Sequence, residues 1–210
     1  MTALEHAATV FVVDDDEAVR SSLRLLLKSL GMPAVTHGSA AEFLAAYDPE
    51  QPGCIILDVR MPGMNGLELQ DELNRRGAII PVIFITGHGD VPMAVEAMQH
   101  GAFDFLQKPF SDKDLTDRIQ RAIATDIRNR TLLGQKDRIR ARLAALTRRE
   151  TQVLQLVTLG KSSKVIATDL GVSQRTVEIH RAHLMEKMGA TSLAHLVRMT
   201  MIADMGISTY

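Results

Sequence analysis

The feature of this chain that most constrains its fold is a series of short apolar runs that alternate with amphipathic segments. The runs are four to six residues long, short enough to be strands buried on both faces of a parallel sheet. They are Val10–Val13, Cys54–Leu57, Ile80–Ile85 and Phe103–Gln107. Helical periodicity is found in Ala18–Leu30, Ser39–Tyr47, Gly66–Arg75, Val91–Gln99 and Asp112–Ala124. Because strand and helix alternate five times, the pattern predicts an α/β fold with a doubly wound, five-stranded parallel sheet.

Five residues at the carboxyl ends of these runs form a candidate chemical site. In the order of the four runs they are Asp14 and Asp15, Asp58, Thr86, and Lys108. An open parallel sheet places its functional groups at this edge. We therefore expect three carboxylates, a hydroxyl group and an ammonium group in one crevice.

This set of side chains predicts a bound cation. Three carboxylates in one crevice stay ionised only beside a cation, and otherwise one of them takes a raised pKa. Magnesium is the expected occupant because it is a hard cation that prefers oxygen ligands. Beside the metal, Asp58 would be a nucleophile toward a phosphoryl group, and Lys108 and Thr86 would contact the oxygens of the acyl phosphate. Gly66 in the following loop would let the backbone approach that group closely.

The stretches around these residues resemble the receiver domain of two-component response regulators. They are Val13–Asp16, Leu57–Gly66, Thr86–Gly89 and Lys108–Phe110, and the resemblance covers roughly residues 8 to 125. It implies that Asp14 and Asp15 form the acidic pocket for magnesium and that Asp58 is the phosphoacceptor. It also implies that the metal takes the main-chain carbonyl of Arg60.

The same resemblance assigns the residues that respond to phosphorylation. It implies that Thr86 is the switch hydroxyl and that Lys108 senses the phosphate. Phe105 stands three residues before this lysine, at the position of the switch aromatic residue. An ordinary core phenylalanine is the alternative interpretation of Phe105.

Acidic and basic residues are distributed unevenly, although the net charge of the chain is only −1. Residues 1–124 contain 18 acidic and 10 basic side chains, whereas residues 125–210 contain 7 acidic and 14 basic ones. An acidic half suits a cation site, and a basic half suits a polyanion such as nucleic acid. We expect a phosphoacceptor domain over 1–124, a helical linker over 125–144 that breaks at Gly134, and a DNA-binding domain over 145–210.

The last third of the chain has the pattern of a small all-α domain with four helices. The helices are expected from Thr147 to Gly160, over Ser163–Leu170, from Ser173 to Met188 and over Ser192–Ala203. The second and third are joined by a turn that contains Gly171. Two short helices joined in this way form a helix-turn-helix, whose second helix lies in the major groove of DNA.

This segment is similar to the LuxR/NarL-type DNA-binding domain over roughly residues 145 to 205. The matching stretches are Leu146–Glu150, Val153–Leu154, Gly160–Lys164, Ile166–Ala167, Ser173–Val177 and His180–Arg181, although Ser163 stands where the family commonly has asparagine. The resemblance implies phosphate contacts from Lys164, Arg175, Thr176 and Arg181, and base contacts from Glu178, Ile179 and Ala182. Ser173 and Gln174 complete the expected DNA-binding residues. Phosphate contacts position such a domain, and base contacts specify the sequence.

The resemblances together imply a transcription regulator that phosphorylation activates. The run Thr86–Met98 looks most like the FixJ branch, in which the face formed here by Val91–Phe105 dimerises. A separate sensor histidine kinase would phosphorylate Asp58, after which the protein would form a homodimer and bind promoter DNA, with RNA polymerase as a further partner. The resemblance implies no enzyme beyond a receiver that promotes its own phosphorylation and dephosphorylation.

Two other functions are open. The first is a constitutive DNA binder whose receiver does not switch. The second is a magnesium-dependent phosphohydrolase that forms an aspartyl phosphate. Such enzymes of the haloacid dehalogenase type usually carry a threonine close to an Asp-x-Asp motif, and Asp14–Glu17 lacks it.

The expected location is the cytoplasm, without a membrane partner. Cys54 is the only cysteine, so an internal disulfide is excluded and a reducing compartment is expected. Apolar stretches in the sequence are shorter than the ~18 residues of a membrane span. The segment Met1–Ala8 has no signal-peptide pattern.

Overall fold

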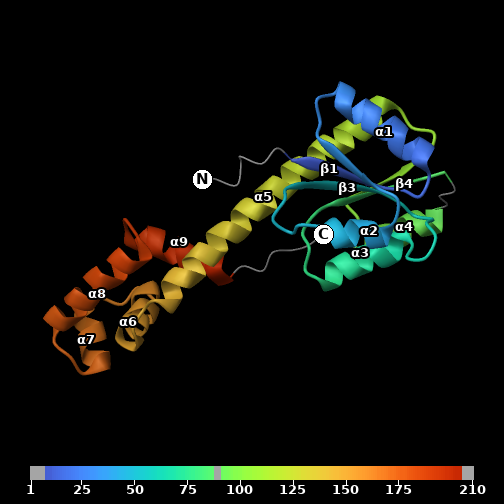
Figure 1. The fold of residues 1–210 in the computed structure, drawn as a ribbon. Coiled ribbons are helices and arrows are strands. Elements are labelled where there is room, and N and C mark those ends of the chain that lie inside the picture. Colours follow the sequence, from blue (N-terminus) through green and yellow to red (C-terminus); the bar gives the residue numbers. More distant parts are fainter. Residues whose placement is uncertain (1–7, 88–90, 205–210) are drawn as a thin grey trace. The chain divides into compact units, whose positions relative to one another are not determined.

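The computed structural model describes residues 8–87 and 91–204 (Figure 1). These residues form two compact units that divide between Thr131 and Leu132. Both units contain part of one long helix, α5 (Asp112–Ala144). The point of division lies within the segment 125–144, for which a helical linker was expected.

The first unit is a five-stranded parallel sheet with helices on both faces, as predicted. Its strands are β1 (Thr9–Val13), β2 (Ala34–His37), β3 (Gly53–Asp58), β4 (Val82–Thr86) and β5 (Asp104–Gln107). Their order is β2-β1-β3-β4-β5, and every neighbouring pair is parallel. The order reverses between β1 and β3, which is where open α/β sheets form a crevice at their carboxyl edge.

Helices cover the two faces of this sheet unequally. The first four are α1 (Glu17–Ser29), α2 (Ala40–Ala46), α3 (Gly66–Arg75) and α4 (Val91–Gln99). Helices α1 and α5 lie on one face, and the other three lie on the opposite face (Figure 1). Along β3, Ile56 packs with the first group, whereas Ile55 and Leu57 pack with the second. Successive side chains of the strand thus point to opposite faces of the sheet.

The two edge strands differ from the sequence predictions. Strand β2 corresponds to none of the predicted apolar runs. It is an edge strand with partly exposed side chains, so its sequence lacks the apolar pattern of a central strand. For β5, burial on both faces was expected, and that prediction is wrong. Only Leu106 of this strand is buried, since β5 forms the other edge of the sheet.

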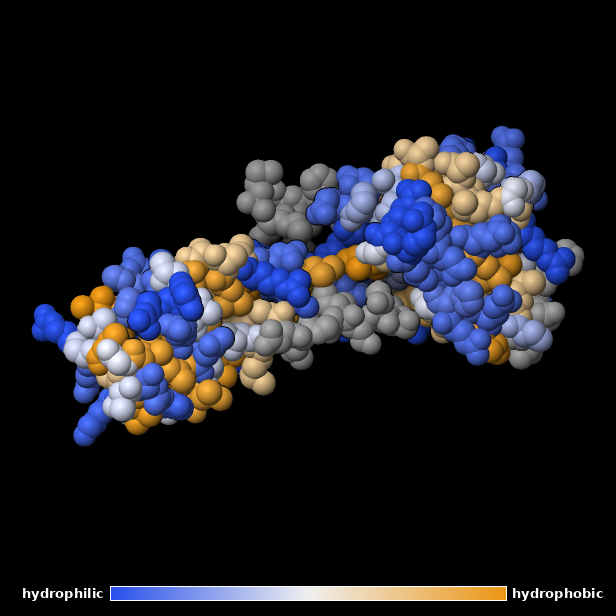
Figure 2. All heavy atoms as spheres, turned by 90° about the horizontal axis from the view of Figure 1, so that it is seen from below, coloured by the Kyte–Doolittle hydropathy of each residue, from blue (hydrophilic) through white to orange (hydrophobic). Residues whose placement is uncertain are grey.

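The second unit packs four short helices against the last part of α5. They are α6 (Arg148–Thr158), α7 (Ser163–Leu170), α8 (Gln174–Met188) and α9 (Leu193–Asp204). Thr147 and Glu150 form the predicted capping box at the start of α6. Gly171 ends α7 in the left-handed region at φ +64°, which a glycine adopts without strain. Figure 2 shows apolar side chains among hydrophilic ones on the surface of this unit.

Helix α5 is continuous over 33 residues, so the predicted break at Gly134 is wrong. A glycine in a helix interior costs about 1 kcal/mol relative to alanine, which the helix-favouring residues around it outweigh. The helix carries many charged residues along its length. Within the described ranges, neither α5 nor any other helix is long and apolar enough to cross a membrane.

Candidate functional site

Asp58 is the last residue of β3 and lies at the carboxyl edge of the sheet. Only 8% of its surface is exposed. Its Oδ2 accepts a hydrogen bond of 2.7 Å from the backbone N–H of Arg60, and its Oδ1 lies 3.6 Å from Nζ of Lys108. The strand and the loop after it therefore hold a carboxylate in a fixed position.

Asp14 provides a second carboxylate at this edge, directly after β1. It is 2% exposed, and its Oδ1 accepts a 2.8 Å hydrogen bond from the backbone N–H of Asp16. Its Oδ2 accepts one of 3.2 Å from Nζ of Lys108. One ammonium group thus contacts two buried carboxylates, Asp14 and Asp58.

Lys108 and Thr86 are placed by the last two strands. The backbone N–H of Lys108 donates to the carbonyl oxygen of Thr86 at 2.9 Å, and the Lys108–Pro109 peptide bond is cis. Thr86 is buried at the end of β4. Phe105, on β5, is partly buried and packs against the core on the α2–α4 face. The hydroxyl, the ammonium and the two carboxylates therefore all lie at the carboxyl edge, as expected.

The charges in this cluster do not balance. Burial raises the pKa of Asp58 above its ordinary value of 3.8, and the negative charge of Asp14 raises it further. The Arg60 N–H and the Lys108 ammonium lower this pKa without cancelling the rise. An additional cation would favour the ionised form of Asp58.

Asp15 lies differently from its neighbour. Its side chain is exposed and lines a hollow of about 570 Å³ beside Arg60, Asn65 and Met93. The described residues contain no group of three His, Cys, Asp or Glu side chains placed to hold a metal ion. Asp14 is buried and contacts Lys108, whereas Asp15 is exposed on the adjoining loop, so the part of Asp15 in an acidic pocket stays a prediction.

Gly66 starts α3 where the loop after Asp58 returns to the sheet. A Cβ atom at this position would lie 2.3 Å from the carbonyl oxygen of Asp58 and 3.0 Å from the ring of Phe84. The sequence predicted a glycine here for an approach of the backbone to a phosphoryl group. The structure shows that the glycine is needed for contact with the backbone of Asp58 itself.

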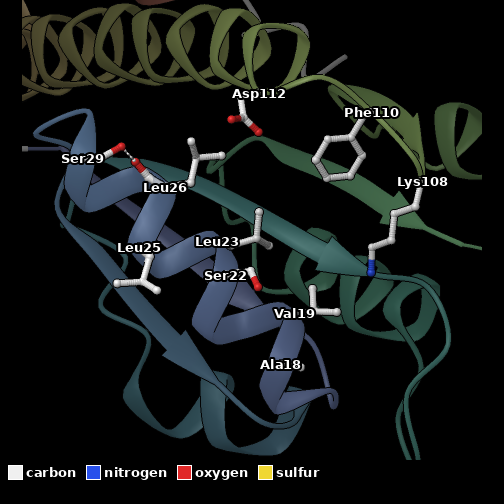
Figure 3. A pocket seen from close by; sticks show the side chains of 10 residues that line it. All are labelled: Ala18, Val19, Ser22, Leu23, Leu25, Leu26, Ser29, Lys108, Phe110 and Asp112. Atoms are coloured by element: carbon white, nitrogen blue, oxygen red, sulfur yellow. Dashed lines mark hydrogen bonds between the residues drawn. The ribbon is translucent and has the colours of Figure 1, made fainter.

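An apolar groove adjoins the site, and sequence reasoning missed it. It lies between α1 and the start of α5 and has a volume of about 640 Å³ (Figure 3). Leu25 and Phe110 line it, and Lys108 stands at its end nearest the carboxylates. Leu25 is 67% exposed. The sequence feature that could have indicated the groove is Leu25, because α1 carries this leucine in addition to the buried Leu23 and Leu27.

The second candidate site is the outer face of α8. The predicted base-contacting residues Glu178, Ile179 and Ala182 are all exposed, whereas Val177 and Leu184 are buried in the core. Ile179 is 49% exposed. Arg175 and Lys164 are exposed as well.

Several of the predicted DNA-contacting side chains already have partners within the unit. Ser173 caps α8 by accepting from the N–H of Thr176, and Gln174 donates to Glu178 at 2.9 Å. Arg181 Nη1 donates to Ser163 Oγ at 3.3 Å, which ties α8 to the start of α7. The serine that replaces the usual asparagine thus keeps a hydrogen bond between the two helices.

Two protein families match the chain, each over one part of it. The family described as response regulator receiver domain matches residues 10–120, which is more than half of the chain. This chain belongs to the response regulators. The family described as bacterial regulatory proteins, luxR family, matches residues 144–200. The response regulator therefore combines a receiver domain with a LuxR-type DNA-binding domain, as predicted.

Several relatives are similar to this chain over nearly its whole length. The transcriptional regulatory protein FixJ of Azorhizobium caulinodans is 50% identical over 200 residues, which cover 95% of each chain. The structure of the response regulator StyR is 45% identical with a TM-score of 0.85, covering 93% of this chain and 98% of StyR. Full-length FixJ from B. japonicum is 42% identical with a TM-score of 0.57, covering 94% and 98%. These similarities confirm the predicted FixJ branch.

Proposed function

We propose that this response regulator accepts a phosphoryl group on Asp58 from a partner histidine kinase and then binds promoter DNA as a homodimer. The observation that carries the proposal is the pair of buried carboxylates, Asp14 and Asp58, that share the ammonium of Lys108. Such a site holds a nucleophile beside positive charge in a partly desolvated crevice. It suits the transfer of an anionic group to Asp58.

In the transfer step, an oxygen of Asp58 attacks the phosphorus of a phosphohistidine. The new O–P bond forms as the P–N bond breaks, and the imidazole of the donor leaves with the electron pair. Lys108 offsets negative charge on the phosphoryl oxygens, and the hydroxyl of Thr86 at the neighbouring strand end contacts one of them. The receiver promotes its own phosphorylation and dephosphorylation and has no other enzymatic activity.

Magnesium is the proposed cofactor of this step. Asp14, Asp58 and the main-chain carbonyl of Arg60 supply the hard oxygen donors that magnesium prefers, and exposed Asp15 lies on the adjoining loop. The raised pKa of Asp58 supports this assignment, because the cluster carries more negative than positive charge. When bound, the metal supplies the charge that neutralises the incoming phosphoryl oxygens.

The groove beside Lys108 is the proposed docking surface for the kinase. A protein donor must bring its phosphorylated side chain to Asp58. The surface of the donor must therefore contact the receiver surface around Asp58. Lys108 belongs both to the site and to the groove (Figure 3). The exposed apolar side chain of Leu25 would be removed from water in a complex with the kinase, which favours docking there.

The output of phosphorylation is assigned to the face formed by α4 and β5, over 91–105. Val95 and Met98 of α4 are exposed apolar residues, which supports a dimer contact there. Phe105 and Thr86 would change position on phosphorylation and alter this face. A dimer would present two copies of α8 to a near-palindromic site, with RNA polymerase as a further partner.

The remaining assignments follow from these roles. Lys164, Arg175, Thr176 and Arg181 are proposed to contact phosphates, Glu178, Ile179 and Ala182 to contact bases, and Ser173 and Gln174 to support them. We assign the receiver to 1–124, the linker to 125–144 and the DNA-binding domain to 145–210. A regulator that receives a phosphoryl group from a kinase and binds DNA would act in the cytoplasm.

The phosphoacceptor role is tested with radiolabelled acetyl phosphate, which replaces the kinase as donor. Wild type should incorporate label in the presence of magnesium, and the label should be lost on chelation of the metal or in the Asp58→Ala variant. Asp48→Ala, at an exposed loop residue, is the matched control and should be labelled like wild type. Label on Asp58→Ala would contradict the assignment. Continuous release of phosphate from generic phosphate esters would favour a phosphohydrolase instead.

A further inference from the structure

The peptide group that joins Asp14 to Asp15 is held by a side chain of helix α1. Nη1 of Arg20 donates to the carbonyl oxygen of Asp14 at 2.6 Å. This carbonyl belongs to the planar peptide group between the two acidic residues, so a contact that fixes it also limits the directions in which both side chains leave the backbone. Arg20 lies near the start of α1 and is partly buried. The acidic loop is therefore oriented from the helix that follows it.

The other hydrogen bonds of this loop act on different atoms. The backbone N–H of Asp14 donates to the carbonyl oxygen of His37 at 3.3 Å, which continues the pairing of β1 with β2. Oδ1 of Asp14 accepts from the backbone N–H of Asp16 at 2.8 Å, and Asp16 is the N-cap of α1. These contacts set the strand end, the carboxylate and the start of the helix, whereas Arg20 sets the carbonyl of Asp14.

The guanidinium of Arg20 is itself placed by the loop between β2 and α2. A Cβ atom on Gly38 in this loop would lie 3.7 Å from Cζ and from Nη1 of Arg20. It would lie 3.5 Å from Oε2 of Glu42, which accepts from the backbone N–H of Gly38 at 2.7 Å. The guanidinium and the carboxylate thus flank the same glycine, where their opposite charges attract each other. Both neighbours limit the freedom of the Arg20 side chain.

We propose that Arg20 is a positioning residue for divalent-cation binding at the carboxyl edge of the sheet, acting through the peptide group between Asp14 and Asp15. This inference rests on the proposed function, because it concerns the cofactor used in phosphorylation of Asp58. Arg20 is not itself a ligand, since a guanidinium has no acceptor atom. Residues that hold metal ligands in place typically change metal affinity by roughly 10- to 100-fold when they are removed.

Three other roles for Arg20 give different results. Through its charge alone, the guanidinium would repel a cation, so its removal would tighten cation binding. A contact of Arg20 with the kinase would speed phosphorylation by the kinase, and its removal would leave cation affinity unchanged. A role in stability alone would alter the number of folded molecules that bind the cation and would leave their dissociation constant unchanged.

The test measures the dissociation constant and the number of sites for Mn²⁺ in the full chain by electron paramagnetic resonance, which detects the free ion, with Mg²⁺ as a competitor. The test variant is Arg20→Met, and Arg20→Lys keeps the charge and a donor. Arg24→Met is the matched control, at an exposed arginine one turn further along α1. Asp14→Asn removes a proposed ligand and shows whether the ion occupies this site.

Arg20→Met should raise the dissociation constant for Mn²⁺ by roughly tenfold and leave the number of sites unchanged. Arg20→Lys should restore part of the affinity, and Arg24→Met should bind Mn²⁺ like wild type. With acetyl phosphate as the donor, Arg20→Met should need a correspondingly higher Mg²⁺ concentration for half-maximal labelling of Asp58. Saturating Mg²⁺ should bring its labelling rate close to that of wild type.

An unchanged or lower dissociation constant for Mn²⁺ in Arg20→Met would overturn the proposal. So would a labelling rate that stays low at saturating Mg²⁺, because Arg20 would then act on phosphoryl transfer and not on the cation. If Arg20→Met does not fold, Arg20→Gln, which keeps a neutral donor, decides by the same dissociation constant. A wild type that binds Mn²⁺ no more tightly than Asp14→Asn would instead contradict the proposed cofactor site, and the inference would fall with it.

Discussion

The phosphoacceptor site and the DNA-binding face are built in opposite ways. The first takes its side chains from strand ends up to 94 residues apart in sequence and buries two carboxylates beside one ammonium. The second takes most of its side chains from α8, and they are largely exposed. Function at the first site therefore depends on packing and charge balance, where one substitution has a large effect. At the second, many weakly coupled contacts add up.

The largest expected effect is on the packing behind Asp58. Gly66→Ala places a Cβ atom 2.3 Å from the carbonyl oxygen of Asp58, so the loop must move, and we expect a loss of about 3 kcal/mol in the free energy of unfolding. Gly134→Ala is the control, since its Cβ meets only Arg138 at 3.9 Å. That variant should gain roughly 0.5–1 kcal/mol. Chemical denaturation of both variants measures the difference, and equal stabilities would contradict the described packing.

The next effect concerns the groove beside the site. Leu25→Asp should slow phosphotransfer from the kinase by about tenfold, the equivalent of 1.4 kcal/mol at an interface. Phosphorylation by acetyl phosphate should be unchanged, because this small donor needs no groove. Leu30→Asp is the matched control, at an exposed leucine that does not line the groove. A slower reaction with acetyl phosphate would show that Leu25 acts on the site and not on docking.

A smaller and additive effect is expected on the DNA-binding face. Lys164→Ala should lower the slope of log K against log salt by about 0.9 and weaken binding to all sequences alike. Lys161→Ala is the comparison, because the ammonium of Lys161 lies 2.8 Å from the carboxylate of Asp169. Because this charge is already paired, Lys161→Ala should change the slope of log K against log salt less than Lys164→Ala does. DNA titrations at several salt concentrations give the slopes of both variants. Equal changes in slope would contradict the proposed phosphate contact of Lys164.

The smallest effect is a pH dependence within the second unit. A hydrogen bond from Lys187 lowers the pKa of Glu150 from its ordinary value of 4.5 to about 2. The stabilisation is complete above pH 4.5 and is lost as the pH falls toward 2, since protonation removes the ion pair. The difference in melting temperature between wild type and Lys187→Met should therefore shrink over this interval. Calorimetry checks this, and a constant difference would contradict the role of the pair.

The residues that sequence reasoning placed correctly are those whose position follows from the strand pattern. Asp14, Asp58, Thr86 and Lys108 all come to the carboxyl edge because parallel strands end there. Side-chain direction was not predictable in the same way. Asp15 is exposed, whereas its neighbour Asp14 is buried against Lys108, a residue that is distant in sequence.

The features that sequence reasoning missed depend on tertiary contacts. Strand β2 is recognisable only through its pairing with β1. Arg142 on α5 donates to the backbone carbonyl of Met188, 46 residues away, and the sequence around Arg142 gives no sign of that contact. Gly134 carries the sequence signal of a helix break, yet α5 is continuous, because the helix-favouring residues around the glycine outweigh its cost.

The most direct test of the central claim is DNA binding at fixed salt, with and without beryllofluoride and magnesium, for wild type and Asp58→Ala. Fixed salt is required because the affinity for phosphates falls steeply with salt. We predict that beryllofluoride tightens binding and produces dimers in wild type and has no effect on Asp58→Ala. Equal binding by both proteins, indifferent to beryllofluoride, would contradict the account and indicate a constitutive DNA binder.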